Sequence, residues 1–407
     1  MRILAAYWMS LFILISLASG CGRFAPERPQ PEALPLVRLS ESRLPEFSDD
    51  LDFERLGEAI EESLAYLNKI PEDRIFLFGK DRYTAGRMIA TLTDFSRFIA
   101  SGPTRRELNR YIADHYFVYQ AIGRNNEREV LFTGYFEPEI KGSPVKTDRY
   151  VYPVYAMPDD LMTIDLALFS SKYEGEKIIG RLHDGTVVPY YTREEIEEAP
   201  EFSQAAEPIA WVQDPVALFF LHVQGSGRVV FEDGKVINVH YHGTNGHAYR
   251  SIGKHLIESG KIERENMSMQ AIYAYLQTNP DQIPAVLNIN PSYVFFETVD
   301  SGPLGCIMAE LVPGRSIALD KSLFPPAAPA FIASFKPVID ENDTITGWTE
   351  FSRFVLNHDT GGAIKGAGRA DIFWGSGKEA EITAGHLKHP GKLYFFVLKK
   401  SGRADGK

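Results

Sequence analysis

Two aspartates in one glycine-rich stretch have the types and spacing that acid–base chemistry needs. The stretch "NHDTGGAIKGAGRADIFWGSG" holds Asp359 and, twelve residues later, Asp371, which precedes the apolar run "IFW". The glycines between the two acids allow the backbone to approach other backbone or a ligand closely. An aspartate that is partly desolvated, or close to a second carboxylate, has a raised pKa and can act as a general acid. The alternative is that both aspartates only form turns with their own backbone, and the spacing alone favours neither interpretation.

The same stretch also matches a short protease motif. Asp359-Thr360-Gly361 has the form Asp-[Ser/Thr]-Gly, and a second such triplet begins at Asp300. An aspartic protease needs two such carboxylates that share one proton. The two triplets are only 59 residues apart, and the sequences around them differ. A pepsin-like enzyme takes its two aspartates from similar and much longer lobes, so the spacing argues against a protease.

Metal, nucleophile and phosphate sites have weaker signals. His240 and His242 alternate on one face of a strand-like stretch, with His247 nearby, and could bind Zn²⁺ with a further ligand. No cysteine or glutamate pattern completes that set, so we expect neither a metal ion nor a cofactor. The sequence contains no Gly-x-Ser-x-Gly motif, and "GSGKEA" is too short for a phosphate-binding loop. The net charge of −11 argues against a nucleic-acid partner.

The elements that must position the aspartates begin with amphipathic helices. Apolar residues recur at spacings of three and four in residues 52–70 and again in residues 87–102, where Gly102 is expected to end the helix. Thr104 and Glu107 form a capping-box pattern that predicts a third helix. We expect all three to be packing helices.

Strand-like segments dominate the rest of the chain. A hairpin is predicted over Arg228–His242, with Asp233-Gly234 at its turn. Two short helices are predicted over residues 249–262 and after Ser268, and strands follow from Tyr293 onward. Many short strands with glycine and proline breaks favour barrels over a doubly wound sheet. A length of 407 residues indicates two or three domains.

The N-terminus predicts export and a lipid anchor. Arg2 is followed by an uncharged apolar run, Ile3–Gly20, and then by Cys21. This order is typical of an export signal, although about 20 apolar residues would also suffice for a single transmembrane anchor. The stretch "LASGC" resembles the lipobox of bacterial lipoproteins, which implies that residues 1–20 are a signal peptide and that Cys21 is acylated. Gly22 after that cysteine resembles a signal for sorting to the outer membrane.

A tether is predicted after the anchor, over residues 21–50. The stretch "GRFAPERPQPEALP" has four prolines in fourteen residues, a composition typical of an extended linker. Lipidation of Cys21 would leave Cys306 as a lone cysteine, which we expect to be a small buried residue.

Several longer motifs make the chain similar to one family. Asp320, Asp359 and Asp371 match the three aspartates of the so-called 3D domain. Upstream, five stretches resemble the membrane-bound lytic transglycosylase A (MltA) family in the same order, and the resemblance covers about residues 50–400. The stretches are "TGYFEPEIKGS" (133–143), "LFFLHVQGSGRV" (218–229), "GTNGHAYRSIGKHLI" (243–257), "SMQAI" (268–272) and "NPSYVFF" (290–296).

The resemblance implies a lytic transglycosylase, which cleaves the β-1,4 bond between N-acetylmuramic acid and N-acetylglucosamine in peptidoglycan and leaves a 1,6-anhydromuramoyl end. A glycosidase needs two carboxylates, whereas this reaction needs one acid/base because the C6 hydroxyl is an internal nucleophile. We assign Asp371 as acid and then base, and Asp359 as the charge that raises the pKa of Asp371 and stabilises the oxocarbenium-like state. Asp320 is expected to hold the sheet or its network together. The alternatives are a non-catalytic peptidoglycan-binding lipoprotein and a lysozyme-like muramidase.

Residues that bind the glycan are expected in the shared motifs. Tyr135 and Trp374 could stack on sugar faces, and Tyr249 with Arg250 is expected to begin a helix whose N-terminus attracts the carboxylate of a stem peptide. The alternatives are core packing for the aromatic residues and simple helix capping. The full set of expected substrate-binding residues is Thr133, Gly134, Tyr135, Gln224, Ser226, Arg228, Tyr249, Arg250 and Trp374.

The resemblance also implies the fold and the location. Residues 51–141 and 289–400 would form a double-psi β-barrel with N-terminal helices, and residues 142–288 a smaller β-barrel inserted within it. The fold class expected is therefore mainly β with N-terminal helices. The expected partners are peptidoglycan glycan strands in a groove between the barrels and the membrane, through Cys21. Cell-wall synthases are further candidate partners. The protein is expected to face the periplasm from the outer membrane.

Overall fold

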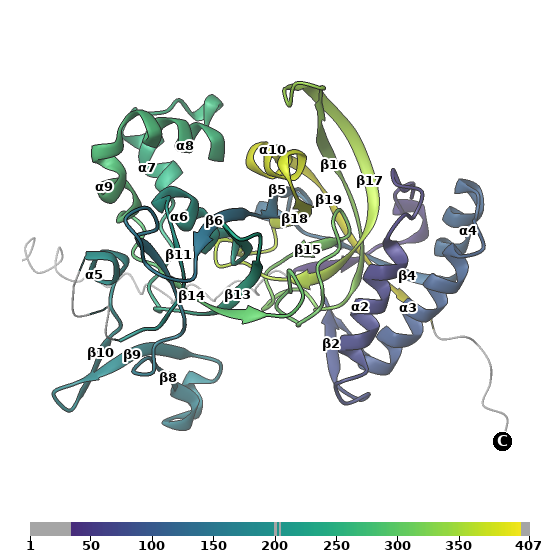
Figure 1. Ribbon diagram of the computed structural model, residues 1–407. Helices are drawn as coiled ribbons and strands as arrows, with labels where there is room; N and C mark the ends of the chain where they lie inside the picture. The colour runs from purple at the N-terminus through teal and green to yellow at the C-terminus, as the bar shows by residue number, and fades with distance from the viewer. Residues whose placement is uncertain (1–33, 199–201, 203–204, 400–407) are drawn as a thin grey trace, which may run out of the picture. The chain divides into compact units, whose positions relative to one another are not determined.

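The computed structural model describes residues 34–198, 202 and 205–399, and Figure 1 labels its elements. All of these elements lie in one compact unit, Pro35–Lys407. The predicted signal peptide, Cys21 and residues 21–33 of the predicted tether lie outside the described residues. In the described part of the chain, no helix combines the length and the apolar character needed to cross a membrane.

Three N-terminal helices form where the apolar spacing predicts them. They are α2 (Leu56–Leu67), α3 (Ala85–Ile99) and α4 (Arg105–His115). The capping box of α4 is confirmed, because the Glu107 N–H donates to the Thr104 hydroxyl at 3.3 Å and the Thr104 N–H donates to the Glu107 carboxylate at 2.8 Å. The apolar faces of these helices pack into one core with the largest sheet.

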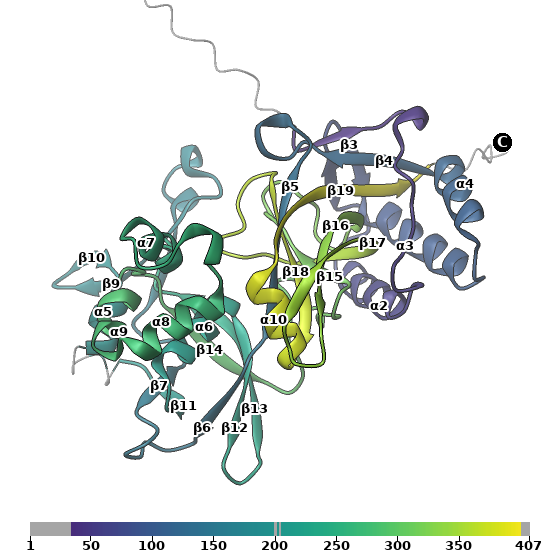
Figure 2. The same ribbon diagram turned by 90° about the horizontal axis from the view of Figure 1, so that it is seen from above.

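An eight-stranded sheet carries the glycine-rich stretch. In spatial order its strands are β1 (Leu36–Arg38), β4 (Tyr116–Ala121), β19 (Lys388–Leu398), β16 (Pro329–Ile339), β17 (Ile345–Asp359), β15 (Ser316–Ala318), β18 (Arg369–Ser376) and β5 (Val130–Glu137). Because β19 also pairs with β5, the last six strands close into a barrel. Figures 1 and 2 show β15, β18 and β5 side by side, with α10 (Lys378–His386) next to β5 and β18.

Aromatic side chains join the helices to this barrel. The ring of Phe95 on α3 lies 4.9 Å from the ring of Phe354 on β17 and 4.9 Å from that of Phe396 on β19. All three side chains are almost completely buried. Such ring pairs add to the stabilisation from buried area, so α3 fixes the strand that ends at Asp359.

A second sheet, of six strands, forms a smaller barrel. In order its strands are β14 (Val294–Val299), β13 (Val236–Thr244), β12 (Ser226–Phe231), β6 (Glu139–Ser143), β11 (Pro208–Val212) and β7 (Tyr152–Tyr155). A bridge between Ala156 and Phe296 connects the two outer strands. The predicted hairpin is confirmed as β12 and β13, with Asp233-Gly234 between them.

Shorter elements complete the fold. The remaining strands are β2 (Ile75–Phe78), β3 (Asp81–Thr84), β8 (Met162–Asp165), β9 (Lys177–His183) and β10 (Thr186–Pro189). The remaining α-helices are α5 (Arg193–Glu198), α6 (Pro215–Gln224), α7 (Ile252–Glu258), α8 (Met269–Thr278) and α9 (Ile283–Leu287). Short 3₁₀ helices are η1 (Glu41–Arg43), η2 (Arg124–Asn126), η3 (Leu166–Leu168), η4 (Ser171–Tyr173), η6 (Arg264–Asn266) and η7 (Pro280–Gln282).

The six-stranded sheet includes strands on both sides of the residues expected to form the insert. β6 begins at Glu139 and β14 ends at Val299, and both strands belong to the six-stranded sheet rather than to the larger one. The six-stranded sheet therefore extends beyond residues 142–288 at both ends. At the C-terminal end, the apolar run "VFFETV" pairs with β13. The mainly β class with N-terminal helices is confirmed, and the double-psi crossing remains a prediction.

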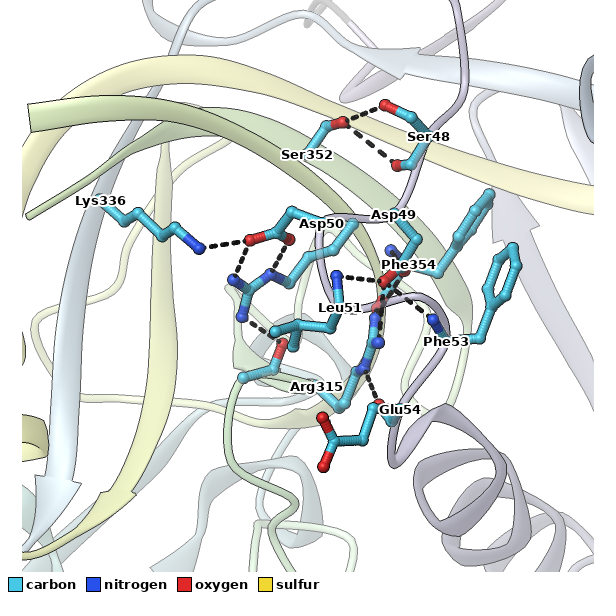
Figure 3. A network of polar contacts seen from close by, with 12 residues as sticks. Ser48, Asp49, Asp50, Leu51, Phe53, Glu54, Arg315, Lys336, Ser352 and Phe354 are labelled. Carbon is cyan, nitrogen blue, oxygen red and sulfur yellow. Dashed lines mark hydrogen bonds and ion pairs between the residues drawn. The ribbon is translucent and has the colours of Figure 1, made fainter. Parts of the chain in front are cut away.

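The segment before α2 packs on the larger sheet, although a tether was predicted as far as residue 50. The carboxylate of Asp49 accepts two hydrogen bonds from the guanidinium of Arg315, at 2.7 and 2.9 Å, and both side chains are buried. Asp50 forms a similar two-bond pair with Arg353 (Figure 3). Two acidic residues therefore hold this segment against basic residues that the sheet buries, and residues 35–50 belong to the folded unit.

Candidate active site

The two aspartates flank the short strand β15. Ala318 of β15 is paired with Asp359 of β17 on one side and with Asp371 of β18 on the other. Directly paired residues project from the same face of a sheet, and two strand spacings place their α carbons about 10 Å apart. Both carboxyl groups therefore lie on one face, with the Ala318 methyl group between them.

A β-bulge decides which residue of β17 is opposite Ala318. Ile317 pairs with Asn357, but Ala318 pairs with Asp359, so His358 is the extra residue. Bulges re-aim side chains and are frequent beside active sites. In a regular ladder His358 would take the position opposite Ala318, so the bulge is what turns Asp359 toward Asp371.

The imidazole of His358 is anchored by two hydroxyl groups. Its two ring nitrogens lie 2.9 Å from the hydroxyl of Ser63 on α2 and 2.8 Å from the hydroxyl of Ser316 on β15. The side chain is completely buried, and burial lowers the pKa of His358 to about 3. The ring is therefore neutral, and its two hydrogen bonds fix the backbone from which Asp359 projects.

Asp371 is a carboxyl group with a raised pKa. Burial is the main cause that raises the pKa of Asp371 to about 6, and the negative charge of Asp359 acts in the same direction. The Thr133 hydroxyl donates to Asp371 Oδ1 at 2.7 Å and lowers the pKa, as does the positive charge of Arg369. Arg369 also donates to Thr133 Oγ1 at 3.2 Å, which leaves the hydroxyl proton directed at the carboxylate.

Asp359 has a raised pKa but different partners. Burial raises its pKa to about 6, while hydrogen bonds from two backbone N–H groups to Oδ1 oppose that effect. The donors are Thr360 at 2.8 Å and Cys306 at 3.0 Å. The Tyr135 hydroxyl is buried beside the carboxyl group and also lowers the pKa, although it does not reach the distance and angle of a hydrogen bond to any described residue. Asp359 is therefore better supported as an anion than Asp371 is.

Asp320, the third aspartate, lies outside this row and stabilises the loop between the other two. Its Oδ1 accepts hydrogen bonds from the hydroxyl and the N–H of Ser322, and its Oδ2 accepts one from the Gly366 N–H at 2.8 Å. Burial alone would raise the pKa of Asp320, but these hydrogen bonds and the charge of Lys365 outweigh it, so the pKa is lowered. Gly366 has a φ of +81°, which a side chain would strain. Asp320 therefore holds the glycine-rich loop in place.

Tyr135 and Trp374, for which sugar stacking and core packing were the two alternatives, lie on opposite faces of the sheet. Tyr135 packs with Ala318 and Phe373 below the carboxyl pair and is only 8% exposed. Trp374 packs with Ala384 of α10 instead. Gly134 also faces α10, because a Cβ atom there would be 2.8 Å from both Ala384 and Trp374. Trp374 and Gly134 are therefore packing residues in this structure, because strand alternation turns them away from Asp371.

Gln224 and Arg228 contact residues at the point where the chain passes from β5 of the larger sheet to β6 of the smaller one, and Ser226 lies between them in the sequence. The Gln224 side-chain oxygen accepts a hydrogen bond from the Phe136 N–H at 3.2 Å. Ser226 is buried at the start of β12, and Arg228 pairs with Glu139 of β6 at 3.2 Å on the surface. The motif therefore borders the end of β5 rather than the aspartate pair itself.

The helix expected to begin at Tyr249 and Arg250 starts later. α7 begins at Ile252, and the Ser251 hydroxyl accepts a hydrogen bond from the Lys254 N–H at 3.1 Å, so the helix is capped by its own chain. Tyr249 instead lines a cavity of about 810 Å³. Gly362 of the glycine-rich stretch lines the same cavity, together with Tyr241 and His247.

Two other expectations concern cysteine and metal. Cys306 is exposed rather than buried, since it lies on the loop whose N–H contacts Asp359. Across residues 34–198, 202 and 205–399, no three His, Cys, Asp or Glu residues are grouped as metal ligands would be. His247 instead contacts the Tyr190 carbonyl at 2.7 Å through Nε2.

Three positions near the pair were absent from the sequence-based site. The Ala318 methyl group carries no catalytic signal, and the importance of both Ala318 and His358 comes from register. Glu137 could have been found, because it alternates with Thr133 and Tyr135 in "TGYFE".

Comparison with known proteins identifies close relatives of these two sheets. A model of the MltA specific insert domain matches residues 131–297, and a 3D domain model matches residues 315–397. The membrane-bound lytic murein transglycosylase A of Escherichia coli K12 is 32% identical over 305 residues, which are 74% of this chain and 73% of that protein. The protein of the same name from Vibrio cholerae is 32% identical over 69% of each chain.

Solved structures agree with the sequence relatives. A membrane-bound lytic murein transglycosylase from Agrobacterium tumefaciens is similar with a TM-score of 0.73 and 27% identity, covering 90% of this chain and 98% of that one. E. coli MltA with bound chitohexaose is similar with a TM-score of 0.67 and 27% identity, covering 90% and 95%.

Proposed function

Because the chain belongs to the membrane-bound lytic murein transglycosylase A family of enzymes, we propose that it cleaves the β-1,4 bond between N-acetylmuramic acid and N-acetylglucosamine in peptidoglycan and leaves a 1,6-anhydromuramoyl end. The observation that carries this proposal is the pair of carboxyl groups opposite Ala318, one of them supported as an anion and the other available as an acid. The relative bound to chitohexaose supports a glycan as the ligand.

The proposed reaction needs one proton donor. Protonated Asp371 gives its proton to the glycosidic oxygen while the bond from that oxygen to C1 of the muramoyl unit breaks. The Asp359 carboxylate stabilises the positive charge that develops at C1. The C6 hydroxyl of the same sugar then bonds to C1 and returns its proton to Asp371, so no water enters the product.

The role of acid is given to Asp371 because its carboxylate form has less support. Two backbone N–H groups donate to Asp359, whereas a single hydroxyl, that of Thr133, donates to Asp371. Hydrogen bonds to the charged form favour that form. The pair is therefore suited to holding one proton on Asp371.

The proposed location is the periplasmic face of the outer membrane, with a lipid on Cys21 as the anchor. The relatives are named membrane-bound, and "LASGC" supports a lipid. An anchor would hold the enzyme against its polymeric substrate, and against cell-wall synthases if these are partners. Cys21→Ser should move the protein from the membrane fraction to the soluble fraction after cell disruption.

The test of the catalytic assignment is Asp371→Asn. We expect this variant to release no detectable muropeptides from purified sacculi while it still cosediments with them, because the amide keeps the shape but cannot donate a proton. Asp300→Asn is a matched control, since Asp300 begins a similar triplet but is exposed at the end of β14. Full activity of Asp371→Asn would contradict the assignment.

A further inference from the structure

A third carboxyl group projects from the face of β5 that carries Thr133 and Tyr135. On β5, Thr133 is paired with Asp371 and Tyr135 with Phe373. The register shift that follows adds its extra residue to β18, so the alternation along β5 continues to Glu137. At about 3.3 Å per residue, Glu137 is about 13 Å from Thr133 along the same face.

Glu137 is a mostly buried residue whose carboxylate has no protein partner in the described part of the chain. Its exposed fraction is 7%, and none of the hydrogen bonds or ion pairs within residues 34–198, 202 and 205–399 involves its carboxylate. Neither carboxylate oxygen of Glu137 is among the fully buried side-chain atoms that lack a hydrogen-bond partner, so the carboxylate reaches solvent and is accessible to a ligand. Burial raises the pKa of Glu137, which is consistent with a carboxylate that lacks compensating donors.

The charges around Glu137 indicate what it could bind. The strongest of them is the positive charge of Arg228, followed by the negative charges of Glu139 and Glu310. Arg228 donates to Glu139 at 3.2 Å, and in the described residues no hydrogen bond or ion pair joins it to the Glu137 carboxylate. An ammonium group would approach against the charge of Arg228, whereas a neutral hydroxyl or amide N–H would not.

We propose that Glu137 is a sugar-binding residue of the glycan groove, whose carboxylate accepts hydrogen bonds from hydroxyl or N-acetyl N–H groups of a unit several residues along β5 from the bond that is cleaved. This inference rests on the proposed function, because it extends the same strand face. Such a contact supplies binding energy remote from the reacting atoms. Hydrogen bonds to a charged partner are stronger than neutral ones, so their loss should be measurable as affinity.

The experiment measures binding apart from catalysis. Calorimetric titration with chitohexaose, which carries no stem peptide, is performed on Asp371→Asn and on Asp371→Asn with Glu137→Gln. We expect the second substitution to weaken binding about 10-fold, which is about 1.4 kcal/mol. Glu310→Gln in the same background is the matched control, since Glu310 is exposed, and it should change the affinity less than 2-fold, roughly the effect of a rim charge.

Other outcomes would overturn the inference. Unchanged chitohexaose affinity in the Glu137→Gln variant would exclude a sugar contact, and weaker binding only to sacculi with intact stem peptides would assign Glu137 to the peptide instead. A thermal melting temperature equal to that of the parent shows that the variant is folded. Failure of the proposed function would appear separately, as a wild-type protein that binds chitohexaose but releases no anhydro ends.

Discussion

The two carboxyl groups of the site are distinguished by their hydrogen-bond donors. Burial raises the pKa of both Asp359 and Asp371 to about 6, but backbone N–H groups support the charged form of the first and a threonine hydroxyl supports that of the second. Asp359 is therefore suited to the role of a fixed anion and Asp371 to that of a proton donor, as different environments separate the roles of other acid–base pairs.

The Thr133 hydroxyl offers a way to change the acid without removing it. Its hydrogen bond stabilises the charged form of Asp371, so Thr133→Val should raise the pKa of that residue further. Because the reaction needs protonated Asp371, activity is lost as pH rises through this pKa. The alkaline limb of the pH–kcat profile should therefore move upward by roughly 0.5–1 pH unit. Thr133→Ser keeps the hydroxyl and should leave the limb in place, and a downward shift in Thr133→Val would show that the sign is wrong.

At the level of elements, the site depends on a three-residue strand and a bulge. β15 separates the two aspartates, and its residue between them, Ala318, has only a methyl group as its side chain. Ile317, next to Ala318, faces the opposite side and belongs to the main core. The two neighbours therefore serve different functions, one in the spacing of the acids and the other in stability.

Ala318→Val should place two methyl groups between the carboxyl groups. We expect kcat to fall at least 10-fold, roughly 1.4 kcal/mol of barrier, because the pair is forced apart or desolvated further. Ile317→Val is the matched control and should show the reverse pattern, with normal kcat and a loss of about 0.5–1.5 kcal/mol in the free energy of unfolding. Equal losses of activity in both variants would mean that β15 acts only as a packing strand.

Local signals in the sequence predicted local structure. The capping box at Thr104, the hairpin turn at Asp233-Gly234 and the short helix after Ser268 all appear as expected, because each depends on residues a few positions apart. The faces of Gly134 and Trp374 could not be predicted in the same way, since the orientation of a strand residue depends on register with distant strands.

The same reasoning accounts for what the sequence did not reveal about the site. The bulge at His358 is set by Ser63 on α2 and Ser316 on β15, which are far apart in the chain. The helix α6 was not predicted, because its apolar run has no strong helical period. Both features require the tertiary structure to be known.

At the scale of the whole molecule, the N-terminal segment fastens the sheet that carries the site. The buried pair of Asp49 and Arg315 joins the segment before α2 to the residue that precedes β15 (Figure 3). The Asp49 carboxylate also accepts hydrogen bonds from the N–H groups of Leu51 and Phe53. Because its oxygens accept hydrogen bonds from several donors, this carboxylate is an example of a charge that tolerates burial because it is paired.

Asp49→Ala should leave the Arg315 guanidinium buried without its partner. We expect a loss of about 3–5 kcal/mol in the free energy of unfolding, measured by urea titration. Glu58→Ala breaks the exposed pair with Arg55 and should cost less than about 1 kcal/mol. Comparable losses in the two variants would show that the buried pair does not anchor the fold.

The central claim is that the sugar's own C6 hydroxyl, rather than water, completes the reaction. Mass spectrometry of the muropeptides that the wild-type protein releases from purified sacculi tests it most directly. We predict products that are lighter by one water than the corresponding reducing-end muropeptides. These products should take up no label when the reaction is run in water enriched in oxygen-18. Products with a reducing end and one heavy oxygen from the solvent would contradict the account and identify a hydrolase.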